Sequence, residues 1–184
     1  MRGADLEERE TELIRSAIRG DPKALHQLVD EHARALFAAA YGMLGKAVDA
    51  EDVVQETFLA AFKGIGRFGG RSALRTWLVG ILVRQVALLH RRRRGKWMVG
   101  LDERHEQSAG PGGMEVRQVD ERLDVAQMLE RLSPEHREVL ILREYEGMSY
   151  EEIAATLDVP RGTVESRLQR ARQELRGWLS GYEG

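Results

Sequence analysis

The pattern of hydrophobic and polar residues near the C-terminal end of the chain predicts two helices joined by a tight corner. Ser149 followed by Glu152 forms a capping box, in which each side chain pairs with a backbone N–H group that a helix start leaves unpaired. Residues 158–162 include a proline and a glycine and are expected to end this first helix, because proline lacks an N–H and glycine tolerates the dihedral angles of a corner. A second helix is expected from residue 161 or 163 to residue 178.

The second of these predicted helices has one apolar face and one polar face. Its apolar residues recur every three or four positions, which is helical spacing. The polar side chains of its first turns are of the types that contact phosphates and base edges when a helix lies in the major groove of DNA. A plain helical hairpin with a solvated charged face is the alternative that spacing leaves open. The apolar residues are Val164, Leu168, Ala171, Leu175 and Trp178, and the polar ones are Arg161, Thr163, Glu165, Ser166, Arg167, Gln169, Arg170 and Arg172.

Helical spacing also governs the rest of the chain, except for one acidic stretch. Helix starts are expected at Asp21-Pro22, at Asp49 and at Ser133-Pro134, because each places a capping or dipole-favoured residue at the first turn. The last of these helices is expected to bury Val139, Leu140, Leu142 and Tyr145. Periodicity fails between residues 99 and 122, which contain the sequence SAGPGG, and no strand pattern of useful length occurs. The predicted fold is therefore all-α, with two small helical domains at residues 1–97 and 123–184, the second a helix-turn-helix domain. An acidic flexible linker at residues 98–122 is expected to join them.

Charge distribution is more informative than total charge. The net charge of the 184 residues is −2, which by itself does not favour a nucleic-acid-binding protein. Residues 63–97, however, contain ten basic residues and no acidic one, whereas the first thirty residues and residues 101–124 are rich in acids. A local positive surface of this kind is sufficient to release counterions from phosphates.

A glycine-rich loop with one aromatic residue lies within the basic segment. Such a loop suits single-stranded nucleic acid, because every base offers a face for stacking and a phosphate to neutralise. A plain interhelical connection is the alternative. The residues of this loop are Phe68, Gly69, Gly70, Arg71 and Ser72.

Other classes of protein lack support in the sequence. There is no cysteine, no histidine pair at a metal-ligand spacing and no phosphate-binding glycine pattern, so we expect no enzyme, no catalytic residue, no metal and no cofactor. The chain start lacks the basic and apolar regions of a signal peptide, and the longest apolar run, residues 79–89, is interrupted and too short to cross a bilayer. We therefore expect a cytoplasmic protein without membrane insertion.

The C-terminal motif resembles that of a known family. LSPEHREVLILREYEGMSYEEIAATL and the following GTVESRLQRARQEL, within residues 129–179, closely resemble the C-terminal domain of bacterial RNA polymerase sigma factors of the extracytoplasmic function group of the sigma-70 family. The resemblance implies a helix-turn-helix that binds the minus thirty-five promoter element. The residues expected to contact this duplex are Arg161, Thr163, Glu165, Ser166, Arg167, Gln169 and Arg170.

A second segment resembles the same family. On its own residues, AEDVVQETFLAAF suggests a well-capped surface helix, with a metal site as a weaker alternative. It is similar to the family segment that binds the coiled coil of the largest polymerase subunit, and Val53, Val54 and Leu59 would divide between that partner and the domain core. The polymerase-binding residues implied are Asp49, Asp52, Val53, Gln55, Glu56 and Leu59.

The glycine-rich loop is the third point of resemblance. It is similar to the family segment that captures bases flipped out of the minus ten promoter element, which implies that residues 68–72 hold unpaired bases. The sequence departs from the family nearby, since Arg84 stands where asparagine is usual and Leu88 where a short polar residue is usual. Arg84 can still contact DNA, whereas Leu88 cannot hydrogen-bond to a base.

Together these features predict a sigma factor that binds core RNA polymerase and directs promoter-specific initiation. Its C-terminal domain would recognise duplex promoter DNA and its N-terminal domain would capture an unpaired strand. Core polymerase, promoter DNA and an anti-sigma protein are the partners that the family resemblance implies. The alternative is a free-standing helix-turn-helix transcription regulator, which would bind duplex DNA without polymerase.

Overall fold

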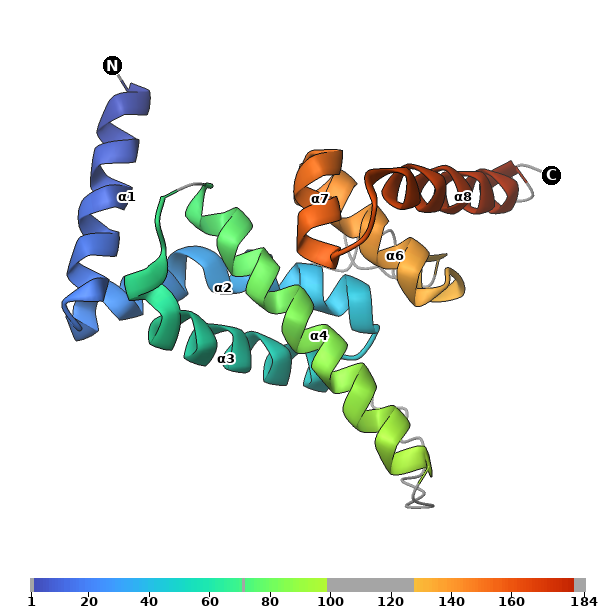
Figure 1. Ribbon diagram of the computed structural model, residues 1–184, viewed down its shortest axis with the longest axis horizontal. Coiled ribbons are helices and arrows are strands. Elements are labelled where there is room, and N and C mark those ends of the chain that lie inside the picture. The colour runs from blue at the N-terminus through green and yellow to red at the C-terminus, as the bar shows by residue number, and fades with distance from the viewer. Residues whose placement is uncertain (1, 71, 99–127, 181–184) are drawn as a thin grey trace, which may run out of the picture.

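The computed structural model describes residues 2–70, 72–98 and 128–180, and the regular elements in these ranges are all helical (Figure 1). The predicted linker lies outside the described residues, except for Met98 at its start. The N-terminal elements are α1 (Arg2–Ile18), α2 (Pro22–Leu44), α3 (Ala47–Gly64), the 3₁₀ turn η1 (Ile65–Arg67) and α4 (Leu74–Met98). The C-terminal elements are α6 (Pro134–Leu140), the π-helical turn η2 (Ile141–Tyr145), α7 (Tyr150–Leu157) and α8 (Arg161–Ser180).

Helices α2, α3 and α4 pack against one another, and α1 lies against α2 and η1. As the sequence predicts, α2 begins with Asp21 as its cap, whose side chain accepts a hydrogen bond from the Lys23 backbone N–H. The core between the three long helices is built from small and branched side chains, which permits close helix packing. Its most deeply buried members include Leu36, Ala39, Ala50, Val79 and Leu82.

The C-terminal helices form a second, smaller unit in which α6 and α7 both pack against α8. The predicted capping box is confirmed, because Ser149 and Glu152 exchange hydrogen bonds at the start of α7. Ser133 likewise caps α6, as predicted. The buried residues of this unit include Val139, Leu142, Ile153, Val164 and Leu168.

The structure corrects two helix boundaries. Helix α3 begins at Ala47 rather than at Asp49, which lies within its first turn. The corner between α7 and α8 depends on Asp158 rather than on Gly162, because Asp158 has the left-handed conformation (φ 54°) and Gly162 is already part of α8. Aspartate tolerates this conformation better than most residues, since its short polar side chain can bond locally.

The prediction that Tyr145 is buried is wrong for a geometric reason. The sequence places Tyr145 on the buried face of the helix that starts at Pro134, yet Tyr145 is 51% exposed. The α-helix gives way to the π-helical turn η2, and the wider π turn changes which side chains face inward. Ile141, which the helical pattern did not select, is 5% exposed and buried instead.

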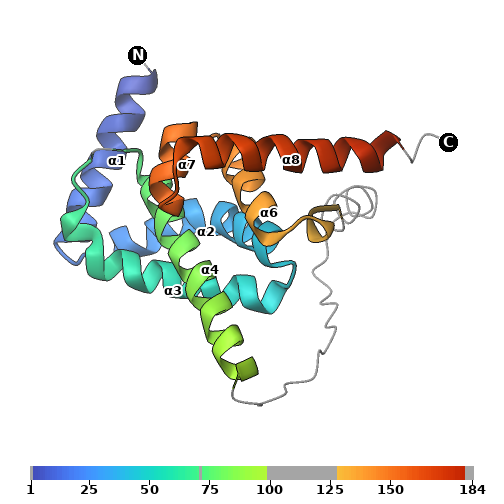
Figure 2. The ribbon, with the colours of Figure 1, turned by 45° about the vertical axis from the view of Figure 1, so that its right-hand side comes forward.

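The two helical units lie side by side. Helix α2 contacts both α6 and η2, and α4 contacts α7. Figure 2 shows α8 and α7 above the α2–α4 layer. The N-terminal and C-terminal units therefore share an interface, although they are separated in the sequence.

Candidate functional site

The polar face of α8 lies open to solvent at its N-terminal half. Arg161, Glu165, Gln169 and Arg170 are exposed, and Thr163, Ser166 and Arg167 are half-buried. Helix α7 packs against α8 and is joined to it by the short corner at Asp158, and one face of the first turns of α8 stays open, as a helix that enters a DNA groove requires.

Some of these α8 side chains already have partners within the protein. Arg161 donates to both Glu151 and Glu165, and these carboxylates raise the pKa of Arg161. The Ser166 hydroxyl donates to the Thr163 carbonyl at 3.0 Å. Two carboxylates therefore compete with a phosphate for the Arg161 guanidinium.

Helix α3 presents a stripe of exposed residues at helical spacing. Asp52, Gln55 and Glu56 are exposed, and Leu59 is 51% exposed. Val48, which is absent from the predicted polymerase-binding set, continues the stripe four residues before Asp52 and is exposed. The sequence signal that could have identified Val48 is an apolar residue beside acidic residues in the first turn of a helix.

Two other residues of the predicted polymerase-binding set have structural roles. Val53 is 4% exposed and belongs to the core with Val54, so neither offers its side chain to a partner in this conformation. Asp49 accepts a hydrogen bond from Arg93 near the end of α4, and its side chain is 13% exposed. This ion pair joins the start of α3 to α4.

The loop between η1 and α4 exposes part of the predicted strand-capture set. Gly69, Gly70 and Ser72 are exposed, and Gly70 has a left-handed conformation (φ 65°) that favours glycine. The Phe68 ring packs on Trp77 with 5.2 Å between ring centroids. Arg71 lies outside the described residues.

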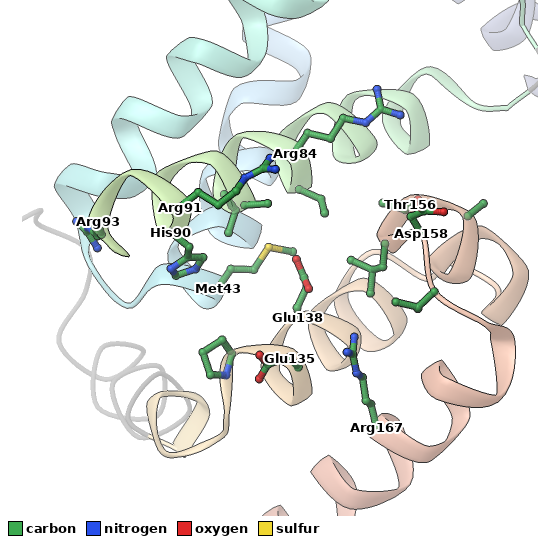
Figure 3. Close-up of a pocket in the computed structure, with 17 residues that line it drawn as sticks. Met43, Arg84, His90, Arg91, Arg93, Glu135, Glu138, Thr156, Asp158 and Arg167 are labelled. Atoms are coloured by element: carbon green, nitrogen blue, oxygen red, sulfur yellow. The ribbon is translucent and has the colours of Figure 1, made fainter. Parts of the chain in front are cut away.

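A cleft of about 1150 Å³ lies between part of α4 and the C-terminal unit. Figure 3 shows Arg84 and Arg91 on the α4 side and Glu138 and Arg167 on the opposite side. Burial raises the pKa of Glu138 to about 7, although the charge of Arg167 acts in the opposite direction. Leu88, on the same helix as Arg84, is partly exposed.

Neither a metal centre nor a membrane span is found in the part of the chain that the structure describes. Those residues contain no group of three or more histidine, aspartate or glutamate side chains placed to hold an ion. No helix among them combines the length and apolar character needed to cross a bilayer.

Comparisons with known proteins agree with this geometry. Two sequence families match, described as Sigma-70 region 2 over residues 28–96 and Sigma-70, region 4 over residues 122–175. The chain is 37% identical over 175 residues to the ECF RNA polymerase sigma factor SigE of Mycolicibacterium smegmatis, covering 89% of this chain and 65% of that protein. It is 36% identical over 178 residues to the RNA polymerase sigma factor NccH of Alcaligenes xylosoxydans xylosoxydans, covering 93% of this chain and 95% of the relative.

A solved structure shows the same arrangement of helices. It contains the sigma factor RpoE in complex with the anti-sigma factor NepR from Bartonella quintana. It superposes with a TM-score of 0.69 at 30% identity, covering 86% of this chain and 98% of that one. The chain thus belongs to the extracytoplasmic function group of the sigma-70 family, the non-enzymatic factors that direct promoter-specific transcription initiation with RNA polymerase.

Proposed function

We propose that α8 binds the duplex of the minus thirty-five promoter element through its exposed N-terminal half. The observation that carries this proposal is the projection of Arg161, Glu165, Gln169 and Arg170 from the first turns of a helix held by a capped α7. Arginine and glutamine side chains bond to base edges and phosphates in the major groove. Half-buried Thr163, Ser166 and Arg167 flank this surface.

The α3 stripe is the proposed contact with core polymerase. Its exposed acids, Asp52 and Glu56, suit basic residues of a partner, and its exposed apolar residues, Val48 and Leu59, supply area whose burial favours association. Asp49 supports this surface through its ion pair with Arg93.

The loop at residues 68–72 is the proposed holder of unpaired minus ten bases. The exposed backbone of Gly69 and Gly70 permits close approach of a nucleotide, and Arg84 lies on the following helix. Extruding a base costs a few kcal/mol, and a loop that binds the extruded base offsets that cost. Phe68 would leave its packing against Trp77 to stack on a base.

An anti-sigma protein is the proposed regulator, because a similar sigma factor was solved with one. We expect it to cover the polymerase-binding surface. The domains are proposed at residues 1–97 and 123–184, joined by residues 98–122, and the protein would act in the cytoplasm, where polymerase and promoter DNA are present.

Two single substitutions test the division of labour between the domains. Asp52→Ala should weaken binding to core polymerase, whereas Arg170→Ala should lower transcription from a cognate promoter and leave core binding intact. Glu8→Ala and Arg176→Ala are the matched controls, since both remove exposed charges outside the proposed surfaces. Unchanged core affinity in Asp52→Ala would remove this residue from the interface. Equal loss of core binding and transcription in Arg170→Ala would assign that residue to the fold or to polymerase binding.

A further inference from the structure

The cleft between part of α4 and the C-terminal unit brings arginine side chains together from two distant segments (Figure 3). Arg84 and Arg91 line the cleft from α4, and Arg167 lines it from α8. No hydrogen bond or ion pair joins any of these three guanidinium groups to another of the residues that the structure describes. Arg93, on the same wall, is instead paired with Asp49. Guanidinium groups that face a cleft without a partner are suited to bind phosphate oxygens in pairs.

Acidic side chains make the two walls of the cleft electrostatically different. Glu135 and Glu138 line it on the C-terminal side, and the charge of Arg167 acts on the carboxyl groups of both. The charge of Arg167 is therefore partly compensated within its own unit. Arg84 and Arg91 have no such compensation, so an anionic group is expected on the α4 wall.

The same cleft has an apolar part. Met43 of α2 and Val86 of α4 are 4% and 3% exposed, and Leu157 and Val159 are half-buried on the C-terminal side. Aliphatic surface of this kind favours the flat faces of an aromatic ring, because both surfaces leave water on contact. Small-molecule sites are typically apolar, with a few polar groups that fix the orientation of the ligand.

Glu138 supplies a polar group for such a ring. Burial raises the pKa of Glu138 to about 7, so part of this carboxyl is protonated near neutral pH. A protonated carboxyl group donates one hydrogen bond and accepts others, whereas a carboxylate only accepts. The ring nitrogens and exocyclic groups of a nucleobase need both kinds of partner.

We propose that this cleft binds a purine nucleoside di- or triphosphate, with its phosphates on Arg84 and Arg91 and its base against the apolar surface near Glu138. The volume of about 1150 Å³ is at the upper end of small-molecule sites, which measure about 300–1,000 Å³, and leaves room for a bicyclic base. The inference goes beyond the proposed polymerase and promoter contacts. Arg84 and Arg167 also belong to the proposed DNA-contact sets, so single-stranded nucleic acid is the alternative occupant.

Binding is measured on the purified full chain, without polymerase or promoter, by isothermal titration calorimetry in buffer free of divalent cations. The probes are the di- and triphosphates of adenosine and guanosine. At least one should bind, and inorganic pyrophosphate and the matching nucleoside should each bind at least about tenfold more weakly, because each lacks part of the contacts. Absence of nucleotide binding would overturn the proposal. Equal affinity for pyrophosphate and nucleotide would also overturn it, since the cleft would then be a site for inorganic anions.

Two substitutions on α4 locate the bound nucleotide. Arg91→Ala removes a proposed phosphate contact, and Ala87→Glu adds a negative charge to the lining of the cleft. Both residues are exposed, so neither change empties the core. Each should weaken nucleotide binding at least about tenfold, which is the effect of losing one charge-assisted hydrogen bond.

Arg92→Ala is the matched control, because Arg92 is exposed beside Arg91 but does not line the cleft. It should bind nucleotide as the unsubstituted chain does. Equal loss of affinity in Arg91→Ala and Arg92→Ala would assign binding to the general positive charge of α4 and overturn the proposal. A single-stranded oligonucleotide that binds and loses affinity in Arg91→Ala, while no nucleotide binds, would assign the cleft to nucleic acid instead.

Discussion

The two helical units differ in the length of their helices and in the residues that they leave exposed. The N-terminal unit packs three helices of 18 to 25 residues and leaves an α3 stripe of acids and apolar side chains exposed. The C-terminal unit relies on α6 and α7, of 7 and 8 residues, to position α8. Short helices have little intrinsic stability, so the C-terminal unit depends on its caps and on a few buried residues.

The difference also appears in how the functional charges are held. On α3, Asp52 and Glu56 are exposed acids. On α8, Arg161 and Arg172 each pair with carboxylates of the same unit, including Glu151 and Glu144. In the proposed roles, the acids of α3 are open to a polymerase, whereas carboxylates of the same unit compete with DNA for the arginines of α8.

The largest effect is expected from a substitution in the core of the C-terminal unit, which is the smaller of the two. Ile153→Ala empties a fully buried position of α7 and should cost about 2–5 kcal/mol of unfolding free energy, which a small unit tolerates poorly. Hydrogen exchange by mass spectrometry should show loss of protection in α7 and α8 with α2–α4 retained, and core polymerase binding through α3 should persist. Leu82→Ala, at a fully buried position of α4, is the matched control and should show the opposite distribution. Uniform loss of protection in both variants would show that the two units fold as one.

A pH-dependent effect is expected at the cleft. Burial raises the Glu138 pKa from 4.5 to about 7, so the folded state binds more protons than the unfolded state between these pH values. Stability therefore falls as pH rises through this window. Glu138→Gln should increase the unfolding free energy by about 1–3 kcal/mol at pH 8 and change it little at pH 4, as measured by urea titration.

Glu135 supplies the control of opposite sign. A hydrogen bond from its own backbone N–H lowers the Glu135 pKa, as does the Ser133 hydroxyl. The stability that the Glu135 carboxylate contributes is present above its unfolded-state pKa and is lost as pH falls through its folded-state pKa. Glu135→Gln should therefore destabilise the protein at pH 8. Stabilisation by both substitutions at pH 8 would refute the assignment of the Glu138 shift to burial.

A smaller effect is expected at the α7 cap. Ser149→Ala removes the side chain that accepts from the Glu152 backbone N–H and should cost about 1 kcal/mol. The loss should appear as faster hydrogen exchange at the start of α7 and as weaker binding to the upstream promoter element. Ser72→Ala, at an exposed position of the N-terminal unit, should not change exchange in α7.

The smallest effect tests the exchange of partners on α8. Glu151→Gln removes one carboxylate from Arg161 without altering a proposed DNA contact, and exposed ion pairs contribute little because solvent screens them. Affinity of the holoenzyme for promoter DNA should rise about twofold, as measured by titration at low salt. Glu152→Gln is unsuitable as a control because Glu152 belongs to the capping box, whereas Glu8→Gln changes the same charge on α1. Equal affinity in Glu151→Gln and Glu8→Gln would show that Arg161 does not contact phosphate.

The features that sequence predicted well are local ones. Caps at Asp21, Ser133 and Ser149 depend on a few neighbouring residues, and each forms as predicted. Tyr145 and Asp158 were misjudged, because a π turn and a left-handed aspartate break the regular spacing on which periodicity relies. The family match then supplied what periodicity could not, namely that these helices belong to a transcription initiation factor.

The pattern of the sequence did not predict contacts between segments that are far apart in the chain. Asp49 was assigned to a partner surface, and its ion pair with Arg93 depends on the packing of α3 against α4. The sequence did not indicate a role for Glu146, since nothing in the residues beside it in the chain shows that tertiary packing buries it against Arg75. Such residues are identified by the fold rather than by spacing.

This chain directs promoter-specific initiation, and we propose that its two units act on one polymerase. The most direct test is open-complex formation with purified core polymerase on a random promoter library, with and without the chain. Melting of selected promoters that requires both components, with a shared upstream and a shared downstream element, is the predicted result. Binding of the chain to duplex DNA without any association with core polymerase would contradict the claim and favour a free-standing regulator.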